Sequence, residues 1–343
     1  MNRNYDHNAL DLFRILATVQ VFLGHFITHF HLPQLTNAVY FIRGVPILFV
    51  LCGFLAAKSL DKYSAKDYLI RRAYRVLPGF WGCIVVNTLI ILALYAIPTL
   101  TDGIIYLVTQ FFGLNFYTGD WLRGYGVGTP NGVLWTIGVQ VQFFLLAPML
   151  YKLLRKLQLP ISTVLMGVLT LLSIAIEKCA GFLPEIVYKL IGVTALPYLY
   201  FLVLGMAGWC FRDQIIPALE KVRWVILPVF VLWKLAENHL PFPQIFDGVM
   251  YNTVTTLLTA LLIFSFGFSF RWRMKRDLTY GFYLYHMVFI NITIHLGYGT
   301  LGFDLQSTAV VLAVTVCPIL AAWLSQRWIE NPVAKLAQKK EGI

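Results

Sequence analysis

Residues 9–30 read ALDLFRILATVQVFLGHFITHF, an apolar run that contains an aspartate, an arginine and two histidines. A helix that crosses a bilayer needs about 20 predominantly apolar residues, so this run is long enough to cross once. Similar runs recur to the end of the chain without strict apolar–polar alternation, which favours helices over barrel strands. We therefore predict an all-α integral membrane protein whose first helix carries polar groups that face the protein interior or water.

The composition supports this fold class. The chain has 343 residues, of which 59% are hydrophobic and 13% charged, and its mean hydropathy is +0.71. Soluble domains contain about 25% charged residues. In lipid only helices and closed barrels satisfy their own backbone hydrogen bonds. The polar start and the lack of a small-residue cleavage pattern predict no cleavable signal peptide. We expect a single transmembrane domain over residues 1–343, with no attached soluble domain.

About ten transmembrane helices are predicted, at 9–30, 39–58, 76–97, 133–150, 161–180, 187–210, 224–239, 250–269, 278–297 and 307–328. If both termini are cytoplasmic, 20 of the 27 basic residues fall in cytoplasmic segments, as expected when positive charge sets orientation. The net charge of +11 then reflects topology and not nucleic-acid binding. We expect a multi-pass protein of the plasma (inner) membrane, in contact with lipid and able to form a homo-oligomer.

The cysteines are scattered singly, without the spacing of a metal site or of a disulfide framework. We predict that they are small core residues and that the protein uses no metal. The five positions are Cys52, Cys83, Cys179, Cys210 and Cys317.

Arg14 and His25 are predicted to lie on one stripe of the first helix, because eleven steps of about 100° return to within roughly 20° of the start. The axial distance between them is about 16 Å at a rise of 1.5 Å per residue. Coenzyme A would fit this geometry, with its phosphates at Arg14 near the cytoplasm and its thioester near His25. The simpler alternative, equally favoured by the spacing, is an Asp11–Arg14 pair at the helix end and a structural His25.

Two further clusters have both structural and functional interpretations. Arg71, Arg72 and Arg75 lie at a predicted helix start, where they could orient the chain in the membrane or bind phosphate. Gln140 and Gln142 lie in an apolar helix and need hydrogen-bond partners, which bonds between helices would supply.

The C-terminal helices carry another polar set. Tyr280, Tyr283 and His286 can share one face, with His286 near mid-membrane, and Pro332 is expected to end the last helix. The Gly-rich aromatic segment GDWLRGYGVGTPNG at 119–132 is either an acceptor-binding loop or an ordinary connector.

These clusters, in this order, resemble the acyltransferase-3 family of integral membrane acyltransferases over nearly the whole chain. The matching segments are Leu10, Asp11, Arg14 and His25; LFVLCGF at 48–54; residues 71–78; LWTIGVQVQFFLLAP at 134–148; residues 279–286; and residues 330–332.

The resemblance implies a membrane O-acetyltransferase that modifies a polysaccharide or related compound. It would move an acetyl or similar short acyl group from cytoplasmic acetyl-CoA or another short acyl-CoA to a hydroxyl of a carbohydrate or glycolipid. His25 matches the essential histidine of the family and would act as general base on the acceptor hydroxyl or as a transient acyl carrier. Arg14, Arg72 and Arg75 match arginines linked to acyl-CoA. Gln140 stands where the family usually has glutamate. The remaining catalytic candidates are Asp11, which would help to organise the CoA entrance, and His286, which would orient the acceptor or acyl oxygen together with Gln140.

Two other function classes remain open from the residues alone. A secondary transporter or a flippase of lipid-linked sugars also has many spans and intramembrane charges. A structural subunit is the third class, although it leaves the buried His and Arg side chains without a purpose.

Overall fold

The computed structural model describes residues 5–6, 8–115, 117–302 and 304–340. The apolar runs form helices throughout, and no strand is assigned among these residues beyond an isolated bridge between Asp247 and Asn252. Six helical segments are long and apolar enough to cross a membrane. A seventh candidate is the pair α8 (Glu185–Gly192) and α9 (Leu199–Cys210), which is bent by 51°. The all-helical fold class, with six or seven helices able to cross a membrane, is therefore confirmed.

Each of the ten predicted ranges overlaps at least one helix. The helices of the six spanning segments are α1 (Leu10–His29), α3 (Gly44–Leu60), α4 (Ala65–Leu94), α6 (Trp135–Lys156), α7 (Leu159–Lys178) and α13 (Leu305–Ser325). Three other overlapping helices are α10 (Arg212–His239), α11 (Thr253–Phe266) and α12 (Thr279–His295), which do not meet the same test of length and hydropathy. Ten crossings and cytoplasmic termini stay predictions.

Two helix boundaries differ from the predicted ones for identifiable reasons. α4 begins at Ala65 and not near residue 76, because the Ser64 hydroxyl accepts a hydrogen bond from the Asp67 backbone N–H, 3.2 Å away, and caps the helix. Pro332 does not end the last helix. The chain passes through a π-helical turn at Gln326–Glu330 into α14 (Asn331–Lys340), where Pro332 occupies the first turn, a position that tolerates proline.

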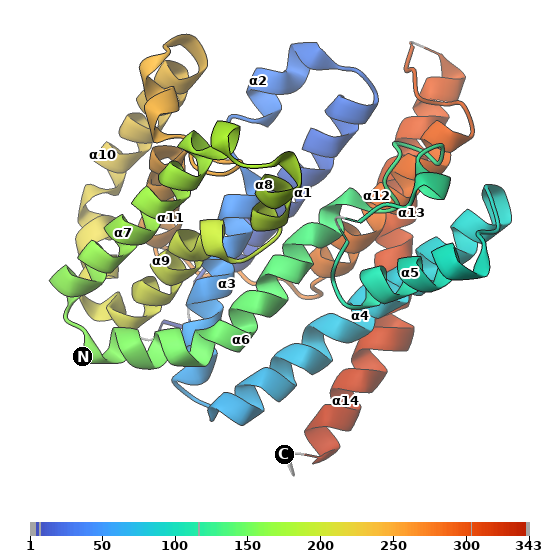
Figure 1. The fold of residues 1–343 in the computed structure, drawn as a ribbon. Coiled ribbons are helices and arrows are strands. Elements are labelled where there is room, and N and C mark those ends of the chain that lie inside the picture. The colour runs from blue at the N-terminus through green and yellow to red at the C-terminus, as the bar shows by residue number, and fades with distance from the viewer. Residues whose placement is uncertain (1–4, 7, 116, 303, 341–343) are drawn as a thin grey trace. The chain divides into compact units, whose positions relative to one another are not determined.

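The chain forms two compact units. Unit 1 comprises Met1–Ala17, Phe41–Tyr68 and Val139–Lys275, and unit 2 comprises Thr18–Tyr40, Leu69–Gly138 and Arg276–Ile343. α1, α4 and α6 each contribute residues to both units. Unit 2 also contains α2 (Thr36–Val39) and α5 (Leu100–Phe111), and within it α12 packs along α13 (Figure 1).

Small residues hold the centre of unit 1 together. α3 packs against α9, and each helix places a glycine against the backbone of the other. A Cβ on Gly53 would collide with the carbonyl group of Leu202, and a Cβ on Gly205 would collide with that of Val50. Close approach through small residues is typical of helix packing in membranes, where apolar burial does not drive helices together.

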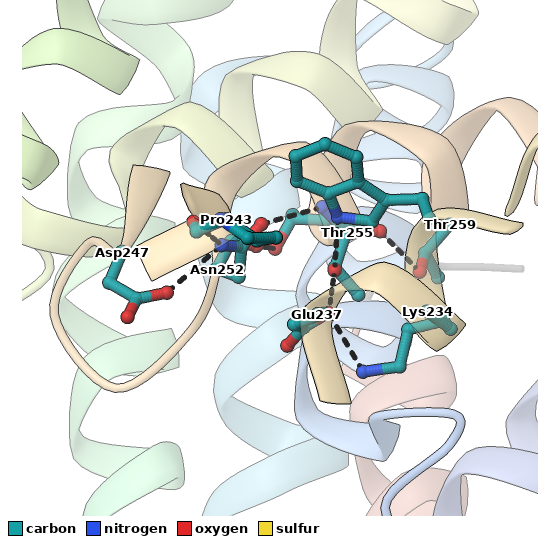
Figure 2. Close-up of polar contacts among 9 residues, drawn as sticks. Lys234, Glu237, Pro243, Asp247, Asn252, Thr255 and Thr259 are labelled. Atoms are coloured by element: carbon teal, nitrogen blue, oxygen red, sulfur yellow. Dashed lines mark hydrogen bonds and ion pairs between the residues drawn. The ribbon is translucent and has the colours of Figure 1, made fainter. Parts of the chain in front are cut away.

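An ion pair within α10 is hydrogen-bonded to α11 in unit 1 (Figure 2). The Lys234 side chain is 1% exposed, and its Nζ lies 2.8 Å from Oε2 of Glu237. The same carboxylate oxygen accepts a hydrogen bond from the Thr255 hydroxyl, which in turn accepts one from Trp233 Nε1 at 3.1 Å. Asn252 ties the connecting turn to the start of α11, because its side chain donates to Pro243 O and Asp247 and accepts from the Thr255 N–H. Each of these groups has a partner, so we assign the network to the fold of unit 1.

Candidate active site

Two histidines from opposite ends of the sequence meet in unit 2. His25 on α1 and His286 on α12 have ring centroids 5.5 Å apart, with an angle of 43° between the ring planes. His286 has no exposed surface, and His25 is half-buried. The structure therefore brings together two candidate residues that the sequence placed on separate helices.

A third imidazole extends this pair along α1. His29 lies four residues after His25, on the same helix face, and the two rings stack with centroids 5.8 Å apart and an interplanar angle of 10°. Aromatic rings line the other side of the cluster, since Phe22 and Phe282 have their centroids 5.9 Å and 6.0 Å from that of His286. The three histidines thus form a row in the order His286, His25, His29, and His286 lies among aromatic rings.

The hydrogen bonding of His286 defines its tautomer. Nδ1 lies 3.2 Å from the carbonyl oxygen of Phe282. A carbonyl oxygen can only accept, so this hydrogen bond requires the proton on Nδ1 and leaves Nε2 of the neutral ring with a lone pair. Nε2 is buried and has no hydrogen-bond partner among the described residues. A buried acceptor without a partner costs free energy, and this atom is therefore suited to receive a substrate hydroxyl.

The arginine cluster of α4 lies near the start of the helix that carries His286. Arg75 pairs with Asp277 at 3.8 Å and keeps 66% of its side chain exposed. Asp277 also accepts hydrogen bonds from the backbone N–H and hydroxyl of Thr279, while the Tyr280 hydroxyl donates to Val76 O at 2.7 Å. These contacts fasten α4 to the first turn of α12. His286 follows Asp277 by nine residues, or about 14 Å along a helix at 1.5 Å per residue.

Asp11 and Arg14 belong to unit 1. Their side chains form an ion pair at 3.4 Å, and the second carboxylate oxygen of Asp11 accepts a hydrogen bond from the Met274 N–H at 3.2 Å. The helix-end pairing considered for these residues is therefore present. The contacts of Asp11 indicate a structural role for its carboxylate, whereas the predicted role of Arg14 toward CoA stays a prediction.

The two glutamines of α6 differ in their surroundings. Gln142 donates to Val193 O and accepts from the Ala195 N–H, both at 3.0 Å, and so bridges the break between α8 and α9. Gln140 is half-buried in unit 1. The predicted requirement for hydrogen-bond partners is met at Gln142, and the predicted catalytic role of Gln140 stays a prediction.

The chain matches one known protein family over most of its length. Residues 7–327, nearly the whole chain, match the model of acyltransferase family 3, which is described as an acyltransferase domain. The chain belongs to the acyltransferase-3 family. This confirms the resemblance found in the sequence and shows that the protein is a membrane acyltransferase, not a transporter or a structural subunit.

Two curated relatives of this acyltransferase come from bacteria. Nodulation protein 10 of Rhizobium leguminosarum bv. viciae is 25% identical over 96% of this chain and 94% of its own length. Peptidoglycan O-acetyltransferase OatA of Listeria monocytogenes serovar 1/2a is 24% identical over 85% of this chain, an alignment that covers 51% of the Listeria protein. No solved structure matches the acyltransferase significantly.

Two contacts of the acyltransferase do not follow from the sequence. No local pattern marks Asp277, because its pairing with Arg75 depends on how α12 is placed against α4. For His29, the i, i+4 spacing from His25 is the signal that the sequence contains. Within the described residues, no group of three His, Cys, Asp or Glu side chains is arranged to hold a metal ion.

Proposed function

We propose that this acyltransferase moves an acetyl or similar short acyl group from a cytoplasmic acyl-CoA to a hydroxyl of a carbohydrate or glycolipid. In this proposal the chain acts as one transmembrane domain of the plasma (inner) membrane, with about ten crossings and both termini in the cytoplasm. The distribution of basic residues supports the topology. The name of the Listeria relative, a peptidoglycan O-acetyltransferase, supports a carbohydrate acceptor.

The observation that carries the proposal is the unpartnered Nε2 of buried His286 beside the ring of His25. An acyl transfer to a hydroxyl needs a base near neutrality to take the hydroxyl proton, and imidazole is such a base. Arg75 on α4, which pairs with Asp277 just before α12, supports a donor with an anionic head, because guanidinium groups bind phosphates through paired hydrogen bonds. The arrangement suits an extended donor whose head is at Arg75 and whose reactive end is at the histidines.

The proposed step uses His25 as the general base and His286 as the group that orients the acceptor. A neighbouring hydroxyl of the acceptor donates a hydrogen bond to Nε2 of His286 and so orients the acceptor, while the reacting hydroxyl gives its proton to His25. Its oxygen forms a bond to the thioester carbonyl carbon, and the carbon–sulfur bond breaks. The departing CoA thiolate then takes the proton from the His25 imidazolium, so that an ester and free CoA thiol are the products.

The proposal is tested by measuring base-labile esters on envelope glycans from cells with and without the gene, by mass spectrometry. We expect ester groups that disappear on deletion, return with the wild-type gene and do not return with His25→Ala. Exposed His239 on α10 provides a matched control, since His239→Ala should restore the esters. Transfer from labelled acetyl-CoA to the glycans in isolated membranes tests the donor.

Two outcomes would contradict the proposal. Identical glycan esters in the deleted and wild-type cells would remove the carbohydrate acceptor. Full ester formation by a His25→Ala protein at wild-type membrane levels would remove the catalytic assignment of that histidine.

A further inference from the structure

A set of buried polar side chains in unit 2 contains atoms that lack hydrogen-bond partners within the part of the chain that the structure describes. Four side chains that are at most 4% exposed each carry an atom without a partner among the described residues, and we call them the amide–tyrosine layer. The members of the layer are Asn87, Gln110, Asn115 and Tyr125. Buried polar atoms are nearly always paired with protein or water, so these four atoms indicate a place where another polar molecule belongs.

The members of the layer come from α4, α5, the residues after α5 and the Gly-rich segment 119–132, and printed contacts link these parts of the chain: Asn87, for example, donates to Pro130 O at 3.1 Å. Tyr106 and Gln110 are the buried residues of α5, and the Tyr106 hydroxyl accepts a hydrogen bond from Thr88 on α4 at 3.3 Å. Tyr106 also belongs to one buried cluster with Tyr125 of the segment. Asn115 donates to Gln110 Oε1 at 2.9 Å.

The unpaired atoms offer both donors and acceptors but no charge. Gln110 Nε2 is a donor, the side-chain oxygens of Asn87 and Asn115 are acceptors, and the Tyr125 hydroxyl can serve as either. Burial, followed by interaction with Tyr106, raises the pKa of Tyr125 to about 12, so its hydroxyl keeps its proton near neutral pH. A neutral compound rich in hydroxyl groups complements such a surface better than an anion or a cation.

The Gly-rich segment connects this layer to the histidines. Asn291 on α12 accepts from the Val127 N–H at 2.9 Å and donates to the carbonyl oxygens of Thr129 and Pro130. Gly126 has a φ of +54°, and a Cβ there would lie 2.8 Å from Cγ of Asn291, so only glycine lets the backbone approach α12 this closely.

The residues that follow in the chain also contact α12, close to His286. Asn131 donates to Leu284 O at 2.9 Å, and the hydroxyls of Thr136 and Tyr283 lie 2.8 Å apart. The Tyr283 ring centroid is 6.0 Å from that of His286. The segment that carries Tyr125 therefore runs along α12 to the level of the imidazole pair.

We propose that the amide–tyrosine layer binds the carbohydrate part of the acceptor and that the Gly-rich segment holds it beside His25 and His286. This assignment rests on the proposed function, because it takes the acceptor to be a carbohydrate. In the proposed topology the segment lies on the outer side of the membrane, where an envelope glycan is available.

Tyr125→Phe is the sharpest test. It removes one hydroxyl that has no partner in the described structure, so it should leave the melting temperature of the purified protein unchanged. The substrate is the glycan fraction of gene-deleted cells, titrated into membranes that contain labelled acetyl-CoA. We expect the apparent KM for the glycan to rise by about 3- to 10-fold, as for the loss of one neutral hydrogen bond, while the apparent KM for acetyl-CoA does not change. Exposed Tyr117, in the same connection, supplies the control, and Tyr117→Phe should behave as the wild type.

The outcomes separate this inference from the proposed function. If the wild type transfers label and Tyr125→Phe shows an unchanged glycan dependence, the hydroxyl faces bound water only and the layer is not the acceptor site. If the wild type transfers no label to any glycan, the proposed function fails and the acceptor site fails with it. A parallel loss of melting temperature and activity in Tyr125→Phe would also overturn the inference, because it would show a structural role for the hydroxyl.

Discussion

Replacing Lys234 by methionine tests the buried network of unit 1. Methionine keeps most of the side-chain length and removes the ammonium group. Oε2 of Glu237 would then keep only its hydrogen bond from the Thr255 hydroxyl. The lost ammonium group belongs to a side chain that is 1% exposed in the wild type. The variant isolates one question, which is whether an unpaired carboxylate can be tolerated between α10 and α11.

The expected cost follows from this burial. Removing one partner of a buried ion pair lowers the free energy of unfolding by about 3–5 kcal/mol when the remaining charge is fully buried. The Glu237 side chain is 19% exposed, so we expect a loss at the lower end of this range. Replacing both partners by apolar residues is often neutral. We therefore expect Lys234→Met to be strongly destabilising, and the double variant Lys234→Met/Glu237→Leu to recover most of the loss.

Thermal unfolding of the purified protein in detergent, followed by a tryptophan or thiol probe, measures these differences. Lys189→Met is the matched control, since Lys189 pairs with Glu185 at the surface with 65% of its side chain exposed, and such pairs contribute little. A melting temperature of Lys234→Met equal to that of Lys189→Met would refute the reasoning. A double variant as unstable as the single one would show that the ion pair itself, and not the unpaired charge, stabilises the fold.

Four further predictions concern the site and its supports. His25→Ala should abolish acyl transfer while the amount of protein in the membrane stays normal, as judged by immunoblot and glycan ester analysis; near-normal turnover would contradict it. Arg72→Ala or Arg75→Ala should raise the apparent KM for acyl-CoA about tenfold, since a charge-assisted hydrogen bond contributes about 1.5–3 kcal/mol; an effect on the acceptor alone would count against a phosphate site. Gln140→Glu should be neutral or harmful in transfer assays from pH 5 to 9, because a buried carboxylate is costly unless paired; a several-fold gain with a new acid limb would show that the position works as a base. Gln142→Leu should lower the free energy of unfolding by about 1–3 kcal/mol through the loss of two hydrogen bonds to the α8–α9 break, and an unchanged melting temperature would contradict that role.

The sequence alone was sufficient for the features that depend on local pattern. The length of the apolar runs and the low content of charged residues predict a helical membrane protein, because lipid leaves few ways to satisfy the backbone. The stripe on the first helix follows from the 3.6-residue period, which is a property of one helix. The order of the short motifs was enough to recognise the acyltransferase-3 family, and the match over residues 7–327 confirmed it.

Tertiary structure decided which of these local features meet. The pairing of His25 with His286, and of Arg75 with Asp277, depends on how α1 and α4 are placed against α12, and no periodicity within one helix contains that information. The same limit explains the glutamines of α6. Gln140 and Gln142 are nearly equivalent in sequence, yet Gln142 reaches the backbone at the bend between α8 and α9 because only its side of α6 faces that bend. Spacing fixes which residues share a face of one helix, whereas packing between helices determines what that face contacts.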